Sequence, residues 1–438
     1  MSPTGSILRH NQLERTMALR AGFAEVDITP PEGTGKIGWI ADLKCNTVLD
    51  PLFARVAVFD NGREQVGFVQ LDTLSVRWTT TDQLRRRLVE AYGFNGANVM
   101  VSATHNHAGP AICAGWPVPR DETYVASVID RCVRAFGEAL DNMEEVQVGF
   151  ARVQEFDVAF NRRVVMRDGL VRSQTHFGSN PDALYLEGPT DPDVSVLALR
   201  IADGAHVGAL VNFACHPTHH GGTNEVTAGF PGLVCKTLKE HGIPVTLYLN
   251  GFYGNLITSD FQRGISLGME EVARKLVVDI QTALADMTYS DDDRLNGASG
   301  TLELPYRVIT DDEYHGRVPG AQRFRTDEIY ESFIDTLVQK IGSERTQKAE
   351  VQALRVGDTV FVGFSGEVFC ELGIQVKTSA HPQTVVTVGG ANGMVGYVPT
   401  RDAFTRGGYE TTLGSPSRMA PGSGEMLVEE ASRLLAGI

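Results

Sequence analysis

Short apolar runs recur along the chain and alternate with segments of helical periodicity. Runs of this length suit buried strands and are too short for most helices. The runs that we predict to be strands are 56–59, 65–71, 98–103, 194–201, 206–214, 244–249, 359–364 and 384–388, after an alternating segment at 21–28. Helical patterns lie between them at 81–92, 122–143, 231–241, 267–287, 327–341 and 424–435.

The helical segments carry recognisable end signals. The segment 81–92 opens with Thr81 and Asp82 and is followed by Gly93, a residue that favours the left-handed conformation in which helices commonly end. Because strands alternate with helices, we predict an α/β fold in which mixed sheets form layers with flanking helices.

Domain organisation is simple at this level. No internal repeat or low-complexity tract is evident, so we expect one domain over residues 21–438 after a flexible tail at 1–20. The acidic run 291–293 predicts a solvated surface turn, with a subdomain linker as the alternative. No signal peptide or membrane-spanning run is recognisable, and we expect a cytoplasmic protein.

Composition narrows the class of partner. The chain has 438 residues, of which 42% are hydrophobic and 21% charged, so it can bury a large core. A net charge of −15 argues against nucleic acid and against stable membrane association, since both need clustered basic residues. We expect a small-molecule substrate, and a homo-oligomer stays open. Six cysteines without Cys-x-x-Cys spacing predict buried thiols.

Polar residues and glycines follow five of the predicted strands. These segments are 104–110, 215–222, 250–255, 365–367 and 389–393. In α/β proteins ligands bind beyond the carboxyl ends of strands, so these segments predict a common site.

Five of the eleven histidines fall in two of these strand-end segments. In extended backbone His105 and His107 would point to the same side, ~7 Å apart. The pair can ligate one metal or divide into a ligand and an acid/base, and His216 strengthens the metal interpretation. Hydrogen-bonded loop histidines are the alternative. His219 and His220 stay unassigned between pocket lining, a second ion and an exposed loop.

A hydrolytic zinc site usually has three or so protein ligands and a position for water. Two histidines and one carboxylate satisfy that count. Glu367 is the best-placed carboxylate, and Glu371 is its rival. The alternative for Glu367 is a carboxylate that only complements the dipole of the helix it precedes.

Several segments, in order, resemble one known family. They are Ala24-Glu25-Val26-Asp27-Ile28-Thr29-Pro30-Pro31, Ala103-Thr104-His105-Asn106-His107-Ala108-Gly109-Pro110, Asn161-Arg162, Asp191-Pro192-Asp193-Val194, Phe213-Ala214-Cys215-His216-Pro217-Thr218, Asn250-Gly251-Phe252-Tyr253-Gly254-Asn255, Gly366-Glu367, Ala391-Asn392-Gly393 to Tyr397, and 417–425. Over roughly 21–438 the chain resembles the neutral/alkaline non-lysosomal ceramidases in their zinc-dependent amidase domain.

The resemblance implies a site and an activity. Zinc would be held by His105, His216, Glu367 and Tyr397, with His107 and Arg162 beside it as catalytic groups. Spacing alone does not single out Tyr397. The implied reaction is hydrolysis of an amide bond by water that the metal activates.

The chain also departs from the family pattern. Ile257 stands where ceramidases carry an essential serine, and Thr258 and Ser259 are the nearest hydroxyls. The C-terminal β domain usual in ceramidases is not expected after the amidase-like region. We therefore predict a zinc-dependent hydrolase that cleaves the C–N bond of a substrate smaller and more soluble than ceramide.

Two alternatives use the same site: hydrolysis of an ester or lactone, and a non-catalytic relative that binds a metal or ligand. Other metallohydrolase classes fit less well. Amidohydrolase barrels expect the His-x-His motif on the first strand, and metallo-β-lactamase-like enzymes expect Asp at the position of Gly109.

Overall fold

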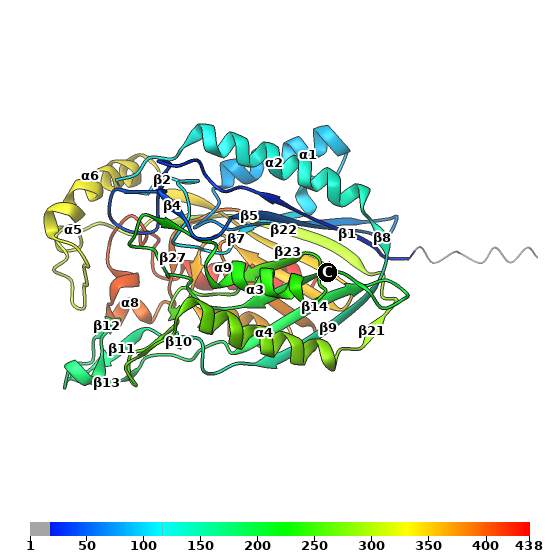
Figure 1. The fold of residues 1–438 in the computed structure, drawn as a ribbon. Coiled ribbons are helices and arrows are strands. Elements are labelled where there is room, and N and C mark those ends of the chain that lie inside the picture. Colours follow the sequence, from blue (N-terminus) through cyan, green and yellow to red (C-terminus); the bar gives the residue numbers. More distant parts are fainter. Residues whose placement is uncertain (1–17, 116) are drawn as a thin grey trace, which may run out of the picture.

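Three large β-sheets surround a shared apolar core in the computed structural model, which describes residues 18–115 and 117–438 (Figure 1). The first sheet has the order β7-β6-β5-β1-β8. Its strands are β1 (Arg20–Asp27), β5 (Phe53–Asp60), β6 (Gln65–Leu71), β7 (Val99–Ala103) and β8 (Glu144–Glu145).

The second and third sheets come later in the chain. The second has the order β17-β15-β14-β9-β21, and the third β22-β23-β24-β26. Their strands are β9 (Gln147–Gln154), β14 (Asp193–Arg200), β15 (His206–Phe213), β17 (Thr246–Asn250), β21 (Tyr289–Ser290), β22 (Leu295–Pro305), β23 (Thr346–Val356), β24 (Thr359–Phe364) and β26 (Thr384–Val388).

One connectivity is repeated in all three sheets, although the sequence shows no repeat. In each, three antiparallel strands are followed by a helix that crosses over to a parallel fourth strand: β1-β5-β6-β7, β9-β14-β15-β17 and β22-β23-β24-β26. The crossover helices are α1 (Trp78–Tyr92), α3 (Gly229–Glu240) and α7 (Cys370–Ser379). Parallel pairing requires such a crossover, which explains why each sheet is mixed.

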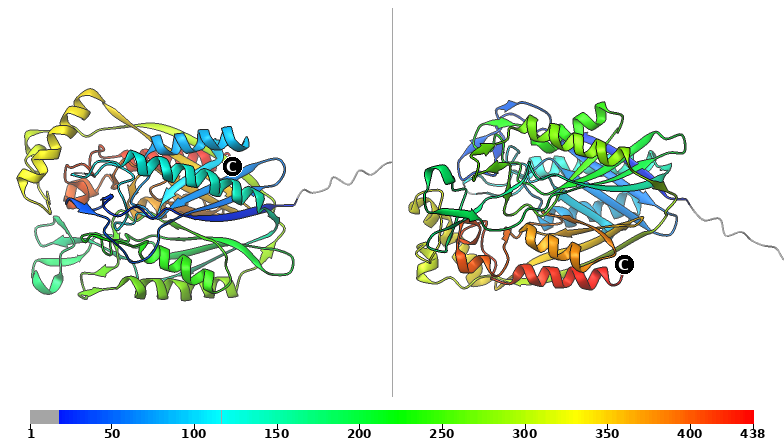
Figure 2. Two further views of the ribbon diagram at one scale, coloured as in Figure 1. Left: turned by 45° about the horizontal axis from the view of Figure 1, so that its top comes forward. Right: turned by 90° about the horizontal axis from the view of Figure 1, so that it is seen from below.

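Each crossover helix has a second helix beside it on the outer face of its sheet (Figure 2). These are α2 (Glu122–Asp141), α4 (Met269–Ala285) and α9 (Ser423–Leu435), which pack against the first, second and third sheets respectively. The inner faces share one cluster, in which Phe59 and Phe68, Leu210 and Leu247, and Phe361 come from the three sheets in turn. Burial of this common core fixes how the sheets face one another.

Short elements gather at the end of the molecule away from β8 and β21 (Figure 1). They include the pairs β2 (Gly35–Lys36) with β3 (Leu43–Lys44), β4 (Thr47–Val48) with β16 (Glu225–Val226), β10 (Phe160–Asn161) with β18 (Leu256–Ile257), β19 (Ser259–Asp260) with β20 (Ile265–Ser266), and β25 (Glu367–Val368) with β27 (Tyr397–Val398). A three-stranded sheet of β11 (Arg163–Met166), β12 (Val171–Ser173) and β13 (Ala183–Leu186) lies here too. The remaining helices are α5 (Asp311–Tyr314), α6 (Asp327–Ser343), α8 (Ala403–Arg406), η1 (Gly96–Asn98), η2 (Phe177–Ser179) and η3 (Tyr409–Thr411).

The predicted α/β class and layered mixed sheets with flanking helices are confirmed, and β6, β24 and β26 have the predicted bounds. The patterns missed β9, β22 and β23. β22 alternates small and polar residues with few large apolar ones, and β23 carries several polar and charged residues although most of it is buried. The acidic run 291–293 connects the second sheet to the third.

Most of the predicted tail lies outside the described residues, and β1 already begins at Arg20. Among the described helices, none combines the length and the apolar character that a bilayer crossing requires.

Candidate functional site

Three histidines from two sheets converge at the carboxyl ends of β7 and β15. Ring centroids of His105 lie 4.8 Å from those of both His107 and His216, and one ring nitrogen of each lies within 4.8 Å of the others. His105 and His216 are buried, and His107 is partly exposed. The structure therefore brings position 105 close enough to position 216 to share one ion.

The convergence of His105 and His107 has a different cause from the one expected. The strand β7 ends at Ala103, and His105 has a φ of 64°, in the left-handed region that few residues other than glycine adopt. The rings therefore do not point to one side of an extended strand. A sharp turn after the strand directs them, and such backbone strain is concentrated at functional sites.

Backbone carbonyls select the same tautomer in all three rings. The Nδ1 atoms lie 2.8 Å from the oxygen of Leu74 for His105, 2.7 Å from that of Gly38 for His107, and 2.7 Å from that of Tyr253 for His216. A carbonyl only accepts hydrogen bonds, so each Nδ1 carries the proton and each neutral ring presents a lone pair at Nε2.

These lone pairs face one another and a carboxylate. Nε2 of His105 lies 3.2 Å from Nε2 of His107, and Oε2 of Glu367 lies 3.4 Å from Nε2 of both His105 and His216. Burial lowers the pKa of His107 well below its usual value and that of His216 to about 4, so protons do not bridge these acceptors at neutral pH. A divalent metal ion would satisfy Nε2 of His105, Nε2 of His216 and the carboxylate of Glu367, because a nitrogen and carboxylate donor set suits such an ion.

Tyr397 lies beside Glu367. The two are register partners in the short parallel pair of β25 and β27. The hydroxyl of Tyr397 accepts a hydrogen bond of 2.9 Å from Nη2 of Arg162, and its ring centroid lies 6.4 Å from that of His216. The structure thus brings all six residues singled out from the sequence into one region.

Glu371, the rival carboxylate, is directed elsewhere. Its Oε2 accepts a hydrogen bond of 2.8 Å from Nδ2 of Asn255, and burial raises its pKa. The neighbouring Cys370 contacts the same oxygen. Of the two candidate carboxylates, Glu367 is the one that reaches the histidines.

The position of the family serine is apolar. Ile257 packs with Val164, Met166 and Phe261. The hydroxyl of Ser259 lies 2.6 Å from that of Ser266. The hydroxyl of Ser259 is therefore held by β20, and the chain provides no serine at the expected position.

Tyr253 supports two of the histidines, a role that the sequence did not reveal. Its ring stacks on that of His105 at 4.4 Å and 27°, and meets that of His216 edge-on at 5.0 Å, while its carbonyl accepts the Nδ1 proton of His216. The signal for Tyr253 in the sequence was its place in the segment 250–255, which follows a predicted strand. Trp39, 42% exposed, meets His107 edge-on at 6.5 Å. No pattern in the sequence pointed to it.

The cysteines and the surface hollows are separate from this chemistry. All six cysteines are buried and unpaired, which confirms the predicted thiols, and burial raises the pKa of Cys215 and Cys370. Two surface hollows of about 560 and 540 Å³ are lined by other residues, including Trp78 and Arg86 in one and Arg172 and Gln322 in the other. The converging histidines line neither hollow.

Comparison with known proteins identifies the family. The sequence model described as "Neutral/alkaline non-lysosomal ceramidase, N-terminal" matches residues 20–240, half of the chain. The chain belongs to this family.

Two curated neutral ceramidases are similar in sequence over a part of their length. That of Mycobacterium tuberculosis is 27% identical over 158 residues, which are 34% of this chain and 23% of the relative. That of Pseudomonas aeruginosa is 29% identical over 122 residues, 28% of this chain and 18% of the relative. The matched regions thus span less than a quarter of either relative.

The likeness in structure is more extensive. The crystal structure of neutral ceramidase from Pseudomonas aeruginosa gives a TM-score of 0.74 at 17% identity and covers 96% of this chain and 75% of that chain. A ceramidase complexed with C2 gives 0.73 at 16% identity, with 96% and 76% covered. At these identities the match establishes the fold, which extends well beyond the region recognised in sequence.

Proposed function

We propose that this chain is a zinc-dependent hydrolase that cleaves the C–N bond of a small-molecule amide. The observation that carries the proposal is the convergence of three tautomer-fixed Nε2 atoms, those of His105, His107 and His216. Two of them, in His105 and His216, lie 3.4 Å from the buried carboxylate of Glu367. Membership of the ceramidase family supports amide hydrolysis. The small soluble substrate remains our expectation from the sequence.

His105, His216, Glu367 and Tyr397 would hold the zinc. They combine two imidazoles, a carboxylate and a phenol oxygen, a donor set within the range that zinc accepts. When bound, the ion supplies Lewis acidity, which lowers the pKa of water toward ~7 and polarises a carbonyl.

His107 is suited to move the proton. Its Nδ1 is committed to the carbonyl of Gly38, so Nε2 is its only acceptor, and it is the most exposed of the three histidines. Burial lowers the pKa of its imidazolium, which keeps the ring neutral and able to accept a proton from the attacking water. The same Nε2 then returns the proton to the leaving nitrogen.

Arg162 is suited to stabilise the oxyanion. Its Nε and Nη2 are occupied by Glu410, Gly254 and Tyr397, which leaves Nη1 without a partner among the described residues. A donor fixed in this way is worth about 3 kcal/mol in a transition state.

The test separates the metal ligands from the acid/base group. Elemental analysis of the purified protein should find zinc, and activity on a panel of N-acyl amines, N-acyl amino acids, cyclic amides and lactones should disappear on chelation and return with Zn²⁺. His107→Ala should lose turnover but keep most of the zinc, whereas His216→Ala should lose both.

Equal zinc loss in the two variants would contradict this division of roles. Zinc binding without activity on the whole panel would favour the non-catalytic alternative, and activity on lactones alone would favour the ester and lactone alternative.

A further inference from the structure

Two consecutive arginines are buried next to the candidate metal centre. Arg162 is 2% exposed and Arg163 is 0% exposed. Consecutive side chains in a regular strand point to opposite faces, but here β10 ends at Asn161 and β11 begins at Arg163. The backbone of Arg162 donates to the oxygen of Asn255 and accepts from Gln174, so the chain changes partners at this residue and both guanidinium groups can turn to one side.

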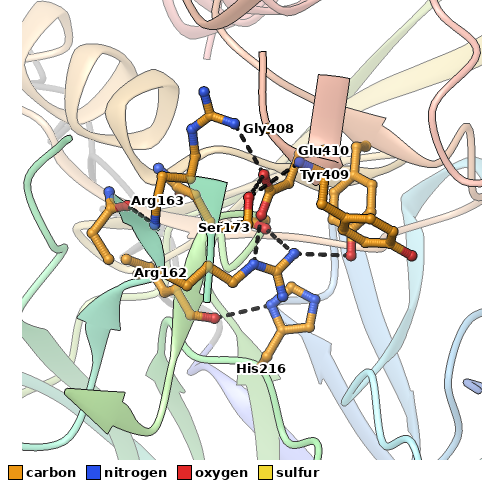
Figure 3. Close-up of polar contacts among 12 residues, drawn as sticks. Arg162, Arg163, Ser173, His216, Gly408, Tyr409 and Glu410 are labelled. Carbon is orange, nitrogen blue, oxygen red and sulfur yellow. Dashed lines mark hydrogen bonds and ion pairs between the residues drawn. The ribbon is translucent and has the colours of Figure 1, made fainter. Parts of the chain in front are cut away.

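Both guanidinium groups meet at Glu410, which is 0% exposed (Figure 3). Its Oε1 accepts Nε of Arg162 at 2.7 Å, and its Oε2 accepts Nη1 of Arg163 at 2.9 Å and the hydroxyl of Ser173 at 2.7 Å. Burial alone would raise the pKa of Glu410, but the two arginines outweigh it and lower the pKa to about 2. Glu410 is therefore an anion at any working pH.

The two arginines depend on Glu410 to different degrees. Arg163 also pairs with Glu187 and donates to the oxygen of Gly407. Arg162 has no second carboxylate within the part of the chain that is described. Loss of the Glu410 charge would leave Arg163 with one ion pair and Arg162 with none, and an unpaired buried charge is costly.

Arg162 in turn holds a candidate metal ligand. Its Nη2 donates to the oxygen of Gly254 at 3.0 Å and to the hydroxyl of Tyr397 at 2.9 Å. In Figure 3 the guanidinium lies between Glu410 and the ring of His216. Three contacts on Nε and Nη2 define the plane of the group, so the direction of its remaining nitrogen is fixed as well.

We infer that Glu410 is a positioning residue for this site. Through Arg162 it fixes the hydroxyl of Tyr397 at the metal position and directs Nη1 of Arg162 toward the substrate. The inference rests on the proposed function because it takes Tyr397 as a metal ligand. Glu410 itself touches neither the metal position nor the substrate.

The matched pair of variants is Glu410→Gln and Glu187→Gln. Each removes one carboxylate charge from Arg163, but only the first removes the partner of Arg162. Metal-free protein is titrated with Co²⁺, and both the dissociation constant and the visible absorption of the bound ion are recorded. We expect Glu410→Gln to weaken Co²⁺ binding about tenfold to a hundredfold, the range typical of losing a group that orients a ligand, and to change the spectrum. Glu187→Gln should bind within about twofold of wild type with the same spectrum.

A double-mutant cycle tests whether Glu410 acts through Arg162. In an Arg162→Ala background, Glu410→Gln should have no further effect on the Co²⁺ spectrum. An additional change of full size there would overturn the inference. If Glu410→Gln fails to fold by circular dichroism, Glu410→Asp and Glu187→Asp replace the pair. They keep the charge but shorten the side chain, and only Glu410→Asp should weaken Co²⁺ binding and change the spectrum.

Different outcomes of the Co²⁺ titration test the role of Glu410 and the metal centre itself. Equal losses of Co²⁺ affinity in Glu410→Gln and Glu187→Gln, with wild-type binding intact, would overturn the role of Glu410 alone. Absence of Co²⁺ binding by the wild-type protein would overturn the proposed metal centre and this inference with it.

Discussion

Five histidines follow β7 and β15, and their hydrogen bonds divide them into two groups. The converging histidines are His105, His107 and His216, in which a carbonyl oxygen holds each Nδ1 and leaves each Nε2 facing the others. All three are brought within reach of one ion.

The peripheral histidines, His219 and His220, have other partners. Nε2 of His219 lies 3.0 Å from the oxygen of Leu267, so this nitrogen carries the proton. Nδ1 of His220 lies 2.6 Å from a carboxylate oxygen of Glu225. Neither side chain belongs to the cluster that the structure assembles from its described residues.

His216 and His219 show that the nitrogen held by a carbonyl decides which nitrogen a histidine can offer, whereas His220 is also held at Nδ1 and differs by lying outside the cluster. His216 and His219 are three residues apart in the same loop, and their opposite nitrogens are bound to carbonyls. A ring that is held at Nδ1 can offer Nε2 to a shared centre, whereas a ring that is held at Nε2 can offer only Nδ1, which lies closer to the backbone. Histidine content alone would not separate the groups.

The largest effect on zinc affinity should come from removing His216, a converging histidine that would hold the metal. Structural zinc sites bind with about 10–16 kcal/mol over four ligands, so one ligand is worth about 2.5 to 4 kcal/mol. His216→Ala should therefore weaken Zn²⁺ affinity by about 70-fold to 900-fold, measured by competition with a chromophoric chelator. Near-wild-type affinity would show that His216 is not a ligand.

In metal-free protein, the loss of stability in acid should report on the same side chain, His216. Burial lowers the pKa of His216 to about 4 in the folded state, against ~6.5 in the unfolded chain. Between these values the unfolded state binds a proton that the folded state does not, so acid lowers the free energy of unfolding. The loss should be about 2 kcal/mol between pH 7 and pH 5, with His107 adding to it in the same direction.

Denaturant unfolding of the chelated protein at several pH values measures this loss. His216→Asn is the control, because its stability should fall less over the same pH range. An identical fall in the variant and the wild type would contradict the assignment.

The smallest effect should come from the peripheral histidines. His219→Ala and His220→Ala should change zinc affinity by less than about twofold, since independent sites do not couple strongly. A loss comparable with that of His216→Ala, measured in the same chelator competition, would mean that the second group also belongs to the metal centre.

Much of the fold was predictable because buried strands and amphipathic helices leave local patterns. β24 and β26 are continuous apolar runs, and their bounds matched. β22 was missed because its small and polar residues form a strand only against β23. Such a strand depends on pairing and not on its own composition.

The site was predictable in part. His105, His107 and His216 stood out as strand-end histidines, but Tyr397 was named only through the family resemblance. Tyr253 and Glu410 were not recognised as members of the site. The ring of Tyr253 stacks on His105, and Glu410 is the buried partner of Arg162. Each contact joins residues that are distant in sequence.

The sequence by itself determined the fold class, the strand ends that carry chemistry and the kind of donor atoms available, because apolar periodicity and residue type are local properties. Only the tertiary structure decided which donors share a centre, which tautomer each ring adopts and which carboxylate serves Arg162. These choices depend on three sheets packing around one core, which brings carbonyls and charges from remote segments to within hydrogen-bond distance.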